Sequence, residues 1–323
     1  MKMGALAGLA CAIALSMTLG QAAAAYPERP IRIIVPYTPG SGADLIGREL
    51  AHRLGQSFNQ TVVVENKGGA SGMVGSDFVA DAAPDGYTLG VGNDATHATN
   101  HLVIPAAKGK DPLERFTPIT EVGSNIIVIA VHPSIPVNNL TELIEYAKQN
   151  PGKMAYGTPG TASPHHLTGV LLESNTGAEF IHVPYRGTAM AVNDLLGGQL
   201  PMAIVTLAAV VPHLQSGKVR PIAVTSGQRA TDLPDLPTVA ETLPGVQMES
   251  WFGMFAPAGL PADIRDRLHA EITTILKEPE MSRKLQMSGI EVVASTPDEF
   301  RAKMAREIAE RQTLIEQANI TAE

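Results

Sequence analysis

The sequence predicts an α/β fold divided between two domains. From Ile31 to Thr225, short apolar runs alternate with longer amphipathic stretches, the pattern of strands joined by helical crossovers. The apolar runs are continuous, as expected of strands buried on both faces of a parallel sheet. Roughly 300 residues follow the N-terminal segment, more than one domain usually holds. We therefore expect two lobes, each a mainly parallel sheet flanked by helices.

The N-terminal segment has the three parts of a secretory signal peptide. A single charge at Lys2 precedes an apolar run from Gly4 to Leu19, which is followed by small residues up to Ala25. The run is shorter than the ~20 apolar residues that a membrane-spanning helix needs. We therefore predict cleavage after Ala24 or Ala25 and a periplasmic location for the mature chain.

Composition excludes several classes of function. Cys11 is the only cysteine and lies in the predicted signal peptide, so disulfides and thiolate chemistry are not expected. Removing the signal peptide takes away Lys2 and moves the net charge from −8 to −9. Without a basic run to contact phosphates, nucleic acid is excluded as a partner. Local dipoles have to hold any anionic ligand, because long-range attraction does not help it.

The elements of the first half follow in order. A strand over 31–35 leads through a turn rich in Pro and Gly into a helix over 43–56. Strands over 61–65, 87–92 and 126–131 come next, each a short apolar run. The segments that continue this rhythm are helices over 139–149, 164–175 and 189–196 and strands over 154–157, 180–183, 201–205 and 221–225.

The composition changes after these strands. Five prolines between Pro234 and Pro261 indicate a crossover segment, which also contains the only tryptophan, Trp251. Beyond it, we expect helices over 262–277 and 297–317. The last helix has a strong start signal, because a threonine that can cap it precedes a proline and two acids.

Two strand-to-helix loops carry the candidate binding groups. The loop over 36–44 and the loop over 157–165 each contain a Thr-Pro-Gly turn followed by small and hydroxylated residues. Glycines let a backbone approach a ligand closely, and unpaired amides at a helix start attract anions. Because ligands of open α/β sheets bind outside the carboxyl ends of the strands, these loops are expected to hold an anion. The alternative is that their Ser and Thr side chains only cap helices.

Longer blocks of the chain resemble a known family. YPERPIRIIVPYTPGSGADL, VVVENKGGASGMVG, VPYRGTAMAVNDLLGGQL and ESWFGMFAPAGLP are similar to the solute-binding receptors of tripartite tricarboxylate transporters, also called Bug receptors. The resemblance extends from Tyr26 nearly to the end of the chain. It implies a periplasmic-binding-protein (flytrap) fold that captures a small carboxylate between two lobes and delivers it to a two-component membrane permease. It implies no enzyme activity, no cofactor and no metal.

The resemblance also implies a set of ligand contacts. The matching positions are Tyr37, Thr38, Ser41 and Gly42 in the first loop, Asn93 and Thr96 after the strand over 87–92, Thr158, Gly160, Thr161, Ser163 and His165 in the second loop, and Tyr185 and Thr206 elsewhere in the second lobe. Ser41 replaces a usual glycine and Met190 a usual proline, so the identity of the ligand does not carry over. Asp44 is expected to pair with the helix dipole rather than with a ligand.

The predicted domain organisation follows from the strand pattern and the resemblance. Residues 1–25 form the signal peptide, 26–123 together with 228–323 form lobe 1, and 124–227 form lobe 2. The chain is then expected to cross between lobes twice, which makes lobe 1 discontinuous. We expect a monomer.

Other functions compete with this interpretation. His97 and His101 have the spacing of two metal ligands on a helix, but a third ligand and a general base are missing from this stretch. GGASGMVG lacks the dinucleotide-binding spacing, and no serine lies in a GxSxG elbow, which disfavours a nucleotide-binding protein and a serine hydrolase. A periplasmic sensor that presents its closed form to a membrane kinase stays open as an alternative.

Overall fold

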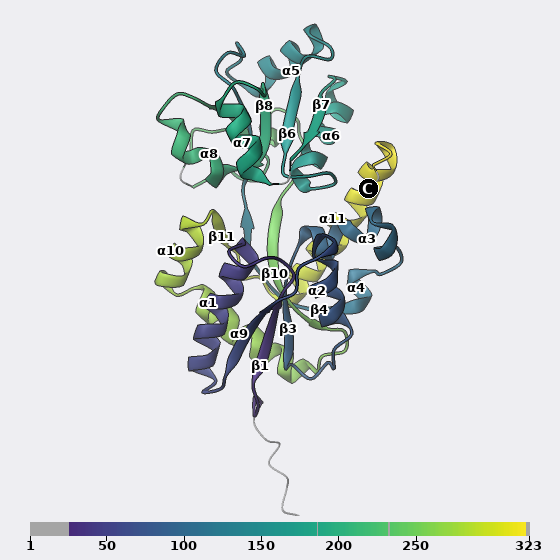
Figure 1. Ribbon diagram of the computed structural model, residues 1–323, viewed down its shortest axis with the longest axis vertical. Coiled ribbons are helices and arrows are strands. Elements are labelled where there is room, and N and C mark those ends of the chain that lie inside the picture. Colours follow the sequence, from purple (N-terminus) through teal and green to yellow (C-terminus); the bar gives the residue numbers. More distant parts are fainter. Residues whose placement is uncertain (1–25, 186, 232, 321–323) are drawn as a thin grey trace, which may run out of the picture.

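The computed structural model describes residues 26–185, 187–231 and 233–320, so the predicted signal peptide lies outside the described residues. Within these ranges the chain forms two α/β lobes, one above the other in Figure 1. This confirms the two-lobed α/β prediction. None of the helices in the described ranges combines the length and apolarity that a membrane crossing requires.

Lobe 1 is built on a six-stranded sheet with the order β11-β4-β10-β3-β1-β2. Strand β1 runs parallel to β2 and β3, whereas β10 runs antiparallel to both β3 and β4, and β11 runs antiparallel to β4. Its strands are β1 (Ile31–Val35), β2 (Val62–Asn66), β3 (Thr88–Asn93), β4 (Phe116–Asn125), β10 (Ser250–Pro257) and β11 (Ile290–Val292).

Lobe 2 is built on a five-stranded sheet with the order β7-β6-β8-β5-β9. Strand β6 runs parallel to β7 and β8, and β5 runs antiparallel to β8 and β9. Its strands are β5 (Ile127–Val131), β6 (Ala155–Thr158), β7 (Ile181–Pro184), β8 (Met202–Thr206) and β9 (Arg220–Val224).

Both sheets are mixed, which corrects the expectation of mainly parallel sheets. A continuous apolar run shows that a strand is buried on both faces, but not which way its neighbours run. Strand β10 was missed for another reason, because it lies in the proline-rich segment predicted as a crossover. All eight of its residues are buried, and prolines lie on both sides of it.

Helices flank both sheets (Figure 1). Those of lobe 1 are α1 (Gly42–Ser57), α2 (Met73–Ala80), α3 (Asn100–Val103), α4 (Pro112–Arg115), α9 (Ala262–Leu276), α10 (Pro279–Met287) and α11 (Pro297–Gln317). Those of lobe 2 are α5 (Leu140–Gln149), α6 (Pro164–Thr176), α7 (Thr188–Leu196) and α8 (Leu207–Leu214). Single turns are η1 (Ala70–Gly72), η2 (Ala95–Thr99), η3 (Pro105–Ala107) and η4 (Val239–Glu241).

Local capping explains why the main helices begin where the sequence predicted. Thr296 and Glu299 form a capping box at the start of α11, and Asn139 accepts a hydrogen bond from the amide of Glu142 at the start of α5. The predicted helices over 164–175, 262–277 and 297–317 are each confirmed to within about one residue at either end.

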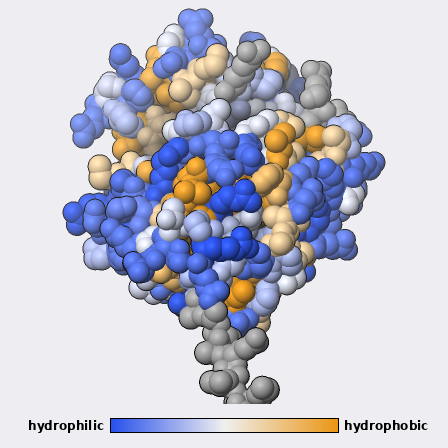
Figure 2. Space-filling view, turned by 60° about the horizontal axis from the view of Figure 1, so that its bottom comes forward, coloured by the Kyte–Doolittle hydropathy of each residue, from blue (hydrophilic) through white to orange (hydrophobic). Residues whose placement is uncertain are grey.

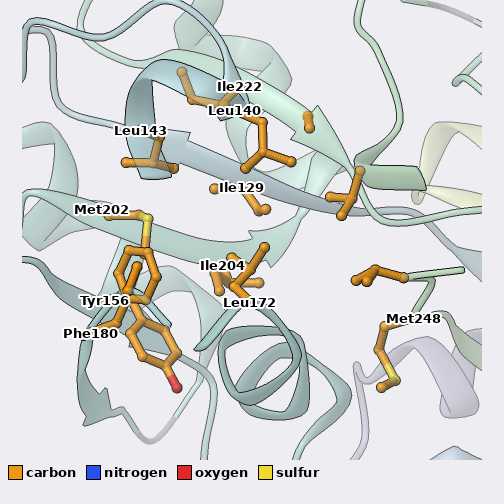
Figure 3. Close-up of a cluster of buried hydrophobic side chains, with 14 of the residues drawn as sticks. Ile129, Leu140, Leu143, Tyr156, Leu172, Phe180, Met202, Ile204, Ile222 and Met248 are labelled. Carbon is orange, nitrogen blue, oxygen red and sulfur yellow. The ribbon is translucent and has the colours of Figure 1, made fainter. Parts of the chain in front are cut away.

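The apolar residues gather in cores on the faces of the two sheets. Figure 3 shows the core of lobe 2, where Leu140 and Leu143 of α5 approach the sheet near Ile129. Met248, from the segment between β9 and β10, belongs to the same buried cluster. On the face of the molecule that Figure 2 shows, apolar groups form small patches among hydrophilic residues.

The chain crosses between the lobes at two places along its length. Strand β4 ends at Asn125 and β5 begins at Ile127, and the chain returns from β9 to lobe 1 at Ser250, where β10 begins. Between β9 and β10, Val239 packs into the core of lobe 2, as Met248 does. The residue limits of the lobes given above stay a prediction.

Helix α11 makes a third connection. Phe300 and Met304, in its first half, are buried in one cluster with Trp251 of β10. Leu314 and Ile315, near its end, are buried in the cluster that forms the core of lobe 2. In Figure 1, α11 accordingly runs from lobe 1 toward lobe 2.

The close packing of α11 on β10 can be tested at Gly253. A Cβ atom at this position would lie 2.4 Å from ring atoms of Phe300, which is fully buried. We expect Gly253→Ala to lower the free energy of unfolding by about 1–3 kcal/mol, because the ring has no space to move into. Urea denaturation measures the effect. Gly68→Ala is the control, since its nearest atom lies 3.8 Å away, and equal losses in the two variants would contradict the packing.

Candidate functional site

The strand pairing of lobe 1 determines which loops face lobe 2. Strand β4 leaves the lobe at Asn125, and Ser250 of β10 pairs with this residue, so this edge of the sheet faces lobe 2. Because β10 is antiparallel to β3, Asn93 at the end of β3 lies at the same edge. Strand β1 is parallel to β3, so the loop that follows Val35 also begins there.

The same reasoning applies to lobe 2. Strand β5 enters the lobe at Ile127, which pairs with Thr206 at the end of β8. Since β6 is parallel to β8 and β7 is parallel to β6, the ends of these strands at Thr158 and Pro184 also face lobe 1. The loop over 36–41 therefore faces lobe 2, and its counterpart after β6 faces lobe 1. The N-termini of α1, α6, α7 and α8 point toward this interlobe edge.

The first loop ends in a capped helix start. Ser41 Oγ accepts a hydrogen bond from Asp44 N at 3.2 Å and so caps α1. The amides of Gly42 and Ala43 precede the first intrahelical bond and have no partner within the described part of the chain. Thr38 is exposed. This loop can therefore offer two amides, the Thr38 hydroxyl and the proton of the Ser41 hydroxyl to an anion.

Asp44 fastens the first loop to the body of lobe 1. Its buried carboxylate accepts hydrogen bonds from Gly40 N at 2.9 Å, Arg48 Nε at 2.9 Å and Asn66 Nδ2 at 2.8 Å. Burial alone would raise the pKa of Asp44, but the hydrogen bonds from Arg48, Gly40 and Asn66 hold this pKa at about 2. Its oxygens are thus engaged within lobe 1.

Two residues that shape this loop could not be identified from the sequence. Asn66 donates through Nδ2 to the carbonyl of Tyr37 at 3.1 Å as well as to Asp44, and its only sequence signal is its place at a strand end. Gly72 has a φ of 90°, and a Cβ atom there would lie 2.6 Å from the methyl group of Thr96 and 3.2 Å from the ring of Tyr37. The glycine cluster of GGASG therefore permits close packing behind the loop.

A chain of hydrogen bonds joins the first loop to the end of β3. The Tyr37 hydroxyl donates to Asn93 Oδ1 at 2.8 Å, and the Thr96 amide donates to the same oxygen at 3.1 Å. Thr96 Oγ1 lies 2.7 Å from Nδ1 of His97, and Thr96 itself is only 2% exposed. The Thr96 hydroxyl is therefore engaged inside lobe 1. The hydrogen bonds from Tyr37 and Thr96 orient Asn93 at the edge of the sheet that faces lobe 2.

His97 is part of this packing. It is 3% exposed, and its ring stacks on Phe255 with 3.8 Å between centroids. Burial lowers its pKa to about 3, so it is neutral near pH 7. The described residues contain no group of three or more His, Cys, Asp or Glu side chains that could hold a metal ion.

The second loop uses its hydroxyl groups unevenly. Ser163 caps α6, and its Oγ also donates to the carbonyl of Gly160 at 2.7 Å. Thr158 is fully buried, and its Oγ1 lies 2.7 Å from Nε2 of His182. Thr161 is exposed, and neither its hydroxyl nor its amide has a partner within the described ranges. Thr161 is thus the residue of this loop with free donors from both side chain and backbone.

The remaining predicted residues of lobe 2 have different surroundings. His165 is 6% exposed, neither ring nitrogen has a partner among the described residues, and burial lowers its pKa to about 3. The Tyr185 hydroxyl donates to Asp194 Oδ2 at 2.7 Å. Thr206 stands directly before α8, where no bond from its side chain caps the helix. Which of these residues touch a ligand stays a prediction.

Comparison with known proteins identifies the family. The family described as TctC, tripartite tricarboxylate transporter family receptor, matches residues 46–320. The chain belongs to this family. The resemblance seen in the sequence is thereby confirmed, and the receptor is a relative of periplasmic binding proteins such as BugD.

Several relatives cover nearly the whole receptor. BugT of Bordetella pertussis is 35% identical over 284 residues, which are 88% of this chain and 87% of the relative. The solved structure of Rpa4515 from R. palustris with adipate has a TM-score of 0.77 and 35% identity, and covers 92% of this chain and 99% of that one. MatC from Rhodopseudomonas palustris with bound malate has a TM-score of 0.73 and 27% identity, and covers 90% and 100%.

Asp44 makes the stability of the receptor depend on pH. Its pKa in the folded state is about 2, below the ordinary value of 3.8, so the ionised carboxylate adds stability above about pH 4 that is lost as the pH falls toward 2. At pH 7 we expect Asp44→Asn to lower the free energy of unfolding by about 1–3 kcal/mol. The difference from the unaltered receptor should shrink at pH 3.

Urea denaturation at the two pH values measures this difference. Asp263→Asn, which removes an exposed carboxylate from the first turn of α9, controls for the loss of one negative charge. A destabilisation by Asp44→Asn that is the same at pH 7 and pH 3 would show that the carboxylate does not fasten the loop.

Proposed function

We propose that this chain is a periplasmic receptor that captures a small carboxylate between its lobes and delivers it to a two-component membrane permease. One observation carries the proposal. Helix N-termini from both lobes point toward the interlobe edge, and the loops that precede α1 and α6 contain amides with no partner in the described part of the chain. Such amides, together with the positive ends of helix dipoles, attract anions.

Backbone groups rather than cationic side chains supply the attraction. Neither the loop over 36–44 nor the loop over 157–165 contains a lysine or arginine. A hydrogen bond to a charged group contributes ~1.5–3 kcal/mol, and micromolar affinity needs only about 8 kcal/mol. The amides of Gly42, Ala43, Thr161 and His165, with the exposed hydroxyls, can therefore offset the cost of ordering the ligand and closing the lobes.

The ligands of the solved relatives support a dicarboxylate. Adipate and malate, which those structures contain, each carry two carboxylates. Two facing loops, each with free amides, suit a ligand with a negative group at either end. In the proposed mechanism, one carboxylate binds the first loop in the open form. The other then recruits the loop around Thr161, which shifts the population toward the closed form.

Ligand binding should be visible as thermal stabilisation. A carboxylate at 100 times its dissociation constant adds about 2.7 kcal/mol to the stability of the folded state and raises the melting temperature. We expect adipate, malate or another dicarboxylate to do so in a thermal-shift screen of the mature chain from Tyr26, and sugars and nucleotides to have no effect. A response to nucleotides or zinc without one to any carboxylate would contradict the receptor function.

Thr161 is the sharpest single test of the second loop. Thr161→Val removes one exposed hydroxyl, so we expect the dissociation constant for the best carboxylate to rise about tenfold while the melting temperature stays unchanged. Ser163→Ala is the matched comparison, since it removes a helix cap and should cost about 1 kcal/mol of stability. Calorimetric titration measures both affinities, and an unchanged affinity in Thr161→Val would remove its hydroxyl from the site.

A further inference from the structure

A buried group of charges lies where α11 meets strands β4 and β10. Lys303 of α11 donates to Glu121 Oε1 at 2.8 Å and to Glu249 Oε2 at 2.9 Å. Glu121 belongs to β4, and Glu249 directly precedes β10. One turn of α11 further on, Glu307 accepts a hydrogen bond from Nε1 of Trp251 at 2.8 Å. These contacts attach α11 to both strands that lead toward lobe 2.

Arg311 extends this group to the loop that follows β3. It is 1% exposed. Its Nη1 donates to Thr99 Oγ1 at 2.7 Å and to the carbonyl and carboxylate oxygens of Asp94 at 3.3 Å each. Its Nη2 donates to Glu307 Oε2 at 2.8 Å and to the carbonyl of Glu249 at 3.3 Å. A single guanidinium therefore joins α11, the start of β10 and the segment over 94–99.

This segment is the one that orients Asn93. Asp94 directly precedes the turn η2, Thr99 is its last residue, and Thr96 lies between them. Arg311 thus holds the two ends of a turn whose middle donates to Asn93 Oδ1. Ser250 fixes the same turn from β10, because its Oγ donates to Asp94 Oδ1 at 2.8 Å.

The other direction along α11 leads to lobe 2. Leu314 and Ile315 follow Arg311 by three and four residues and are buried in the cluster that forms the core of lobe 2. Arg311 therefore lies at the point where α11 passes from its contacts with lobe 1 to its contacts with lobe 2.

We propose that Arg311 is a positioning residue of the ligand site. Arg311 ties the turn over 94–99 to α11, so that the groups that orient Asn93 move together with the helix that reaches lobe 2. The consequence for affinity rests on the proposed carboxylate-binding function. A buried ion pair adds little net stability compared with apolar packing of the same volume. The contribution of Arg311 therefore lies in which elements it connects rather than in how much it stabilises the fold. The forked geometry of arginine allows one side chain to serve three elements at once, which lysine cannot do.

Trp251 supplies a spectroscopic signal at this point. It is the only tryptophan of the chain and is fully buried. Its Nε1 donates to Glu307 Oε2, the oxygen that also accepts from Arg311. A change in the position of α11 relative to β10 therefore alters the surroundings of the indole, and we expect ligand binding to shift its fluorescence.

The experiment compares Arg311→Lys and Thr99→Val with the unaltered chain. Thr99→Val removes the shortest contact of Arg311 without leaving a charge unpaired, so it should fold even if Arg311→Lys does not. Arg306→Lys, on an exposed position of the same helix, is the control. With adipate and malate as probes, we expect dissociation constants about 3- to 30-fold higher in the first two variants and unchanged values in the control.

A second readout needs no ligand. Amide hydrogen exchange in 93–99 should be faster in Thr99→Val and Arg311→Lys than in Arg306→Lys, and the fluorescence of Trp251 should differ from that of the unaltered chain. Unchanged exchange in 93–99 and unchanged affinity, with only a lower melting temperature, would overturn the positioning role. If the unaltered chain binds neither acid nor any other carboxylate, the proposed function fails, and the exchange measurement still decides the role of Arg311.

Discussion

The antiparallel pairing of β4 with β10 sets the orientation of the other elements. Because Ser250 lies opposite Asn125, both crossings of the chain leave the first sheet at the same edge. The direction of β3, and through it of β1, follows from the direction of β10. The orientation of lobe 2 is set by β5, with which the chain enters this lobe at Ile127. The facing arrangement of the two loops is therefore a consequence of strand pairing.

Local signals allowed much of this fold to be predicted. The helix over 297–317 could be predicted because Thr296, Pro297 and Glu299 determine its start within one turn. Strand β10 could not, since Gly253 interrupts its apolar run and the prolines around it indicate a loop. The direction of neighbouring strands also could not be predicted. It depends on pairs such as Gly253 with Gly92, which are far apart in the sequence.

The candidate site could likewise be predicted only in part. Its two loops could be found because glycine, proline and hydroxyl residues cluster after apolar strands. The role of each hydroxyl could not, because Ser41 and Ser163 have the same sequence surroundings as Thr161 yet serve as helix caps. No sequence pattern marked Arg311 as a residue that connects elements of the site. It contacts Asp94 from 217 residues away, and an arginine in an amphipathic helix is ordinarily exposed.

The use of backbone amides in the proposed site affects how such a receptor can diverge. Every residue type except proline carries the N–H donor, so any substitution in either loop other than by proline retains the groups that we propose to hold a carboxylate. The side chains of Thr38 and Thr161 are exposed and can vary without loss of the backbone N–H groups. Descendants of one ancestor can thus exchange one acid for another while inheriting the same anion-binding backbone.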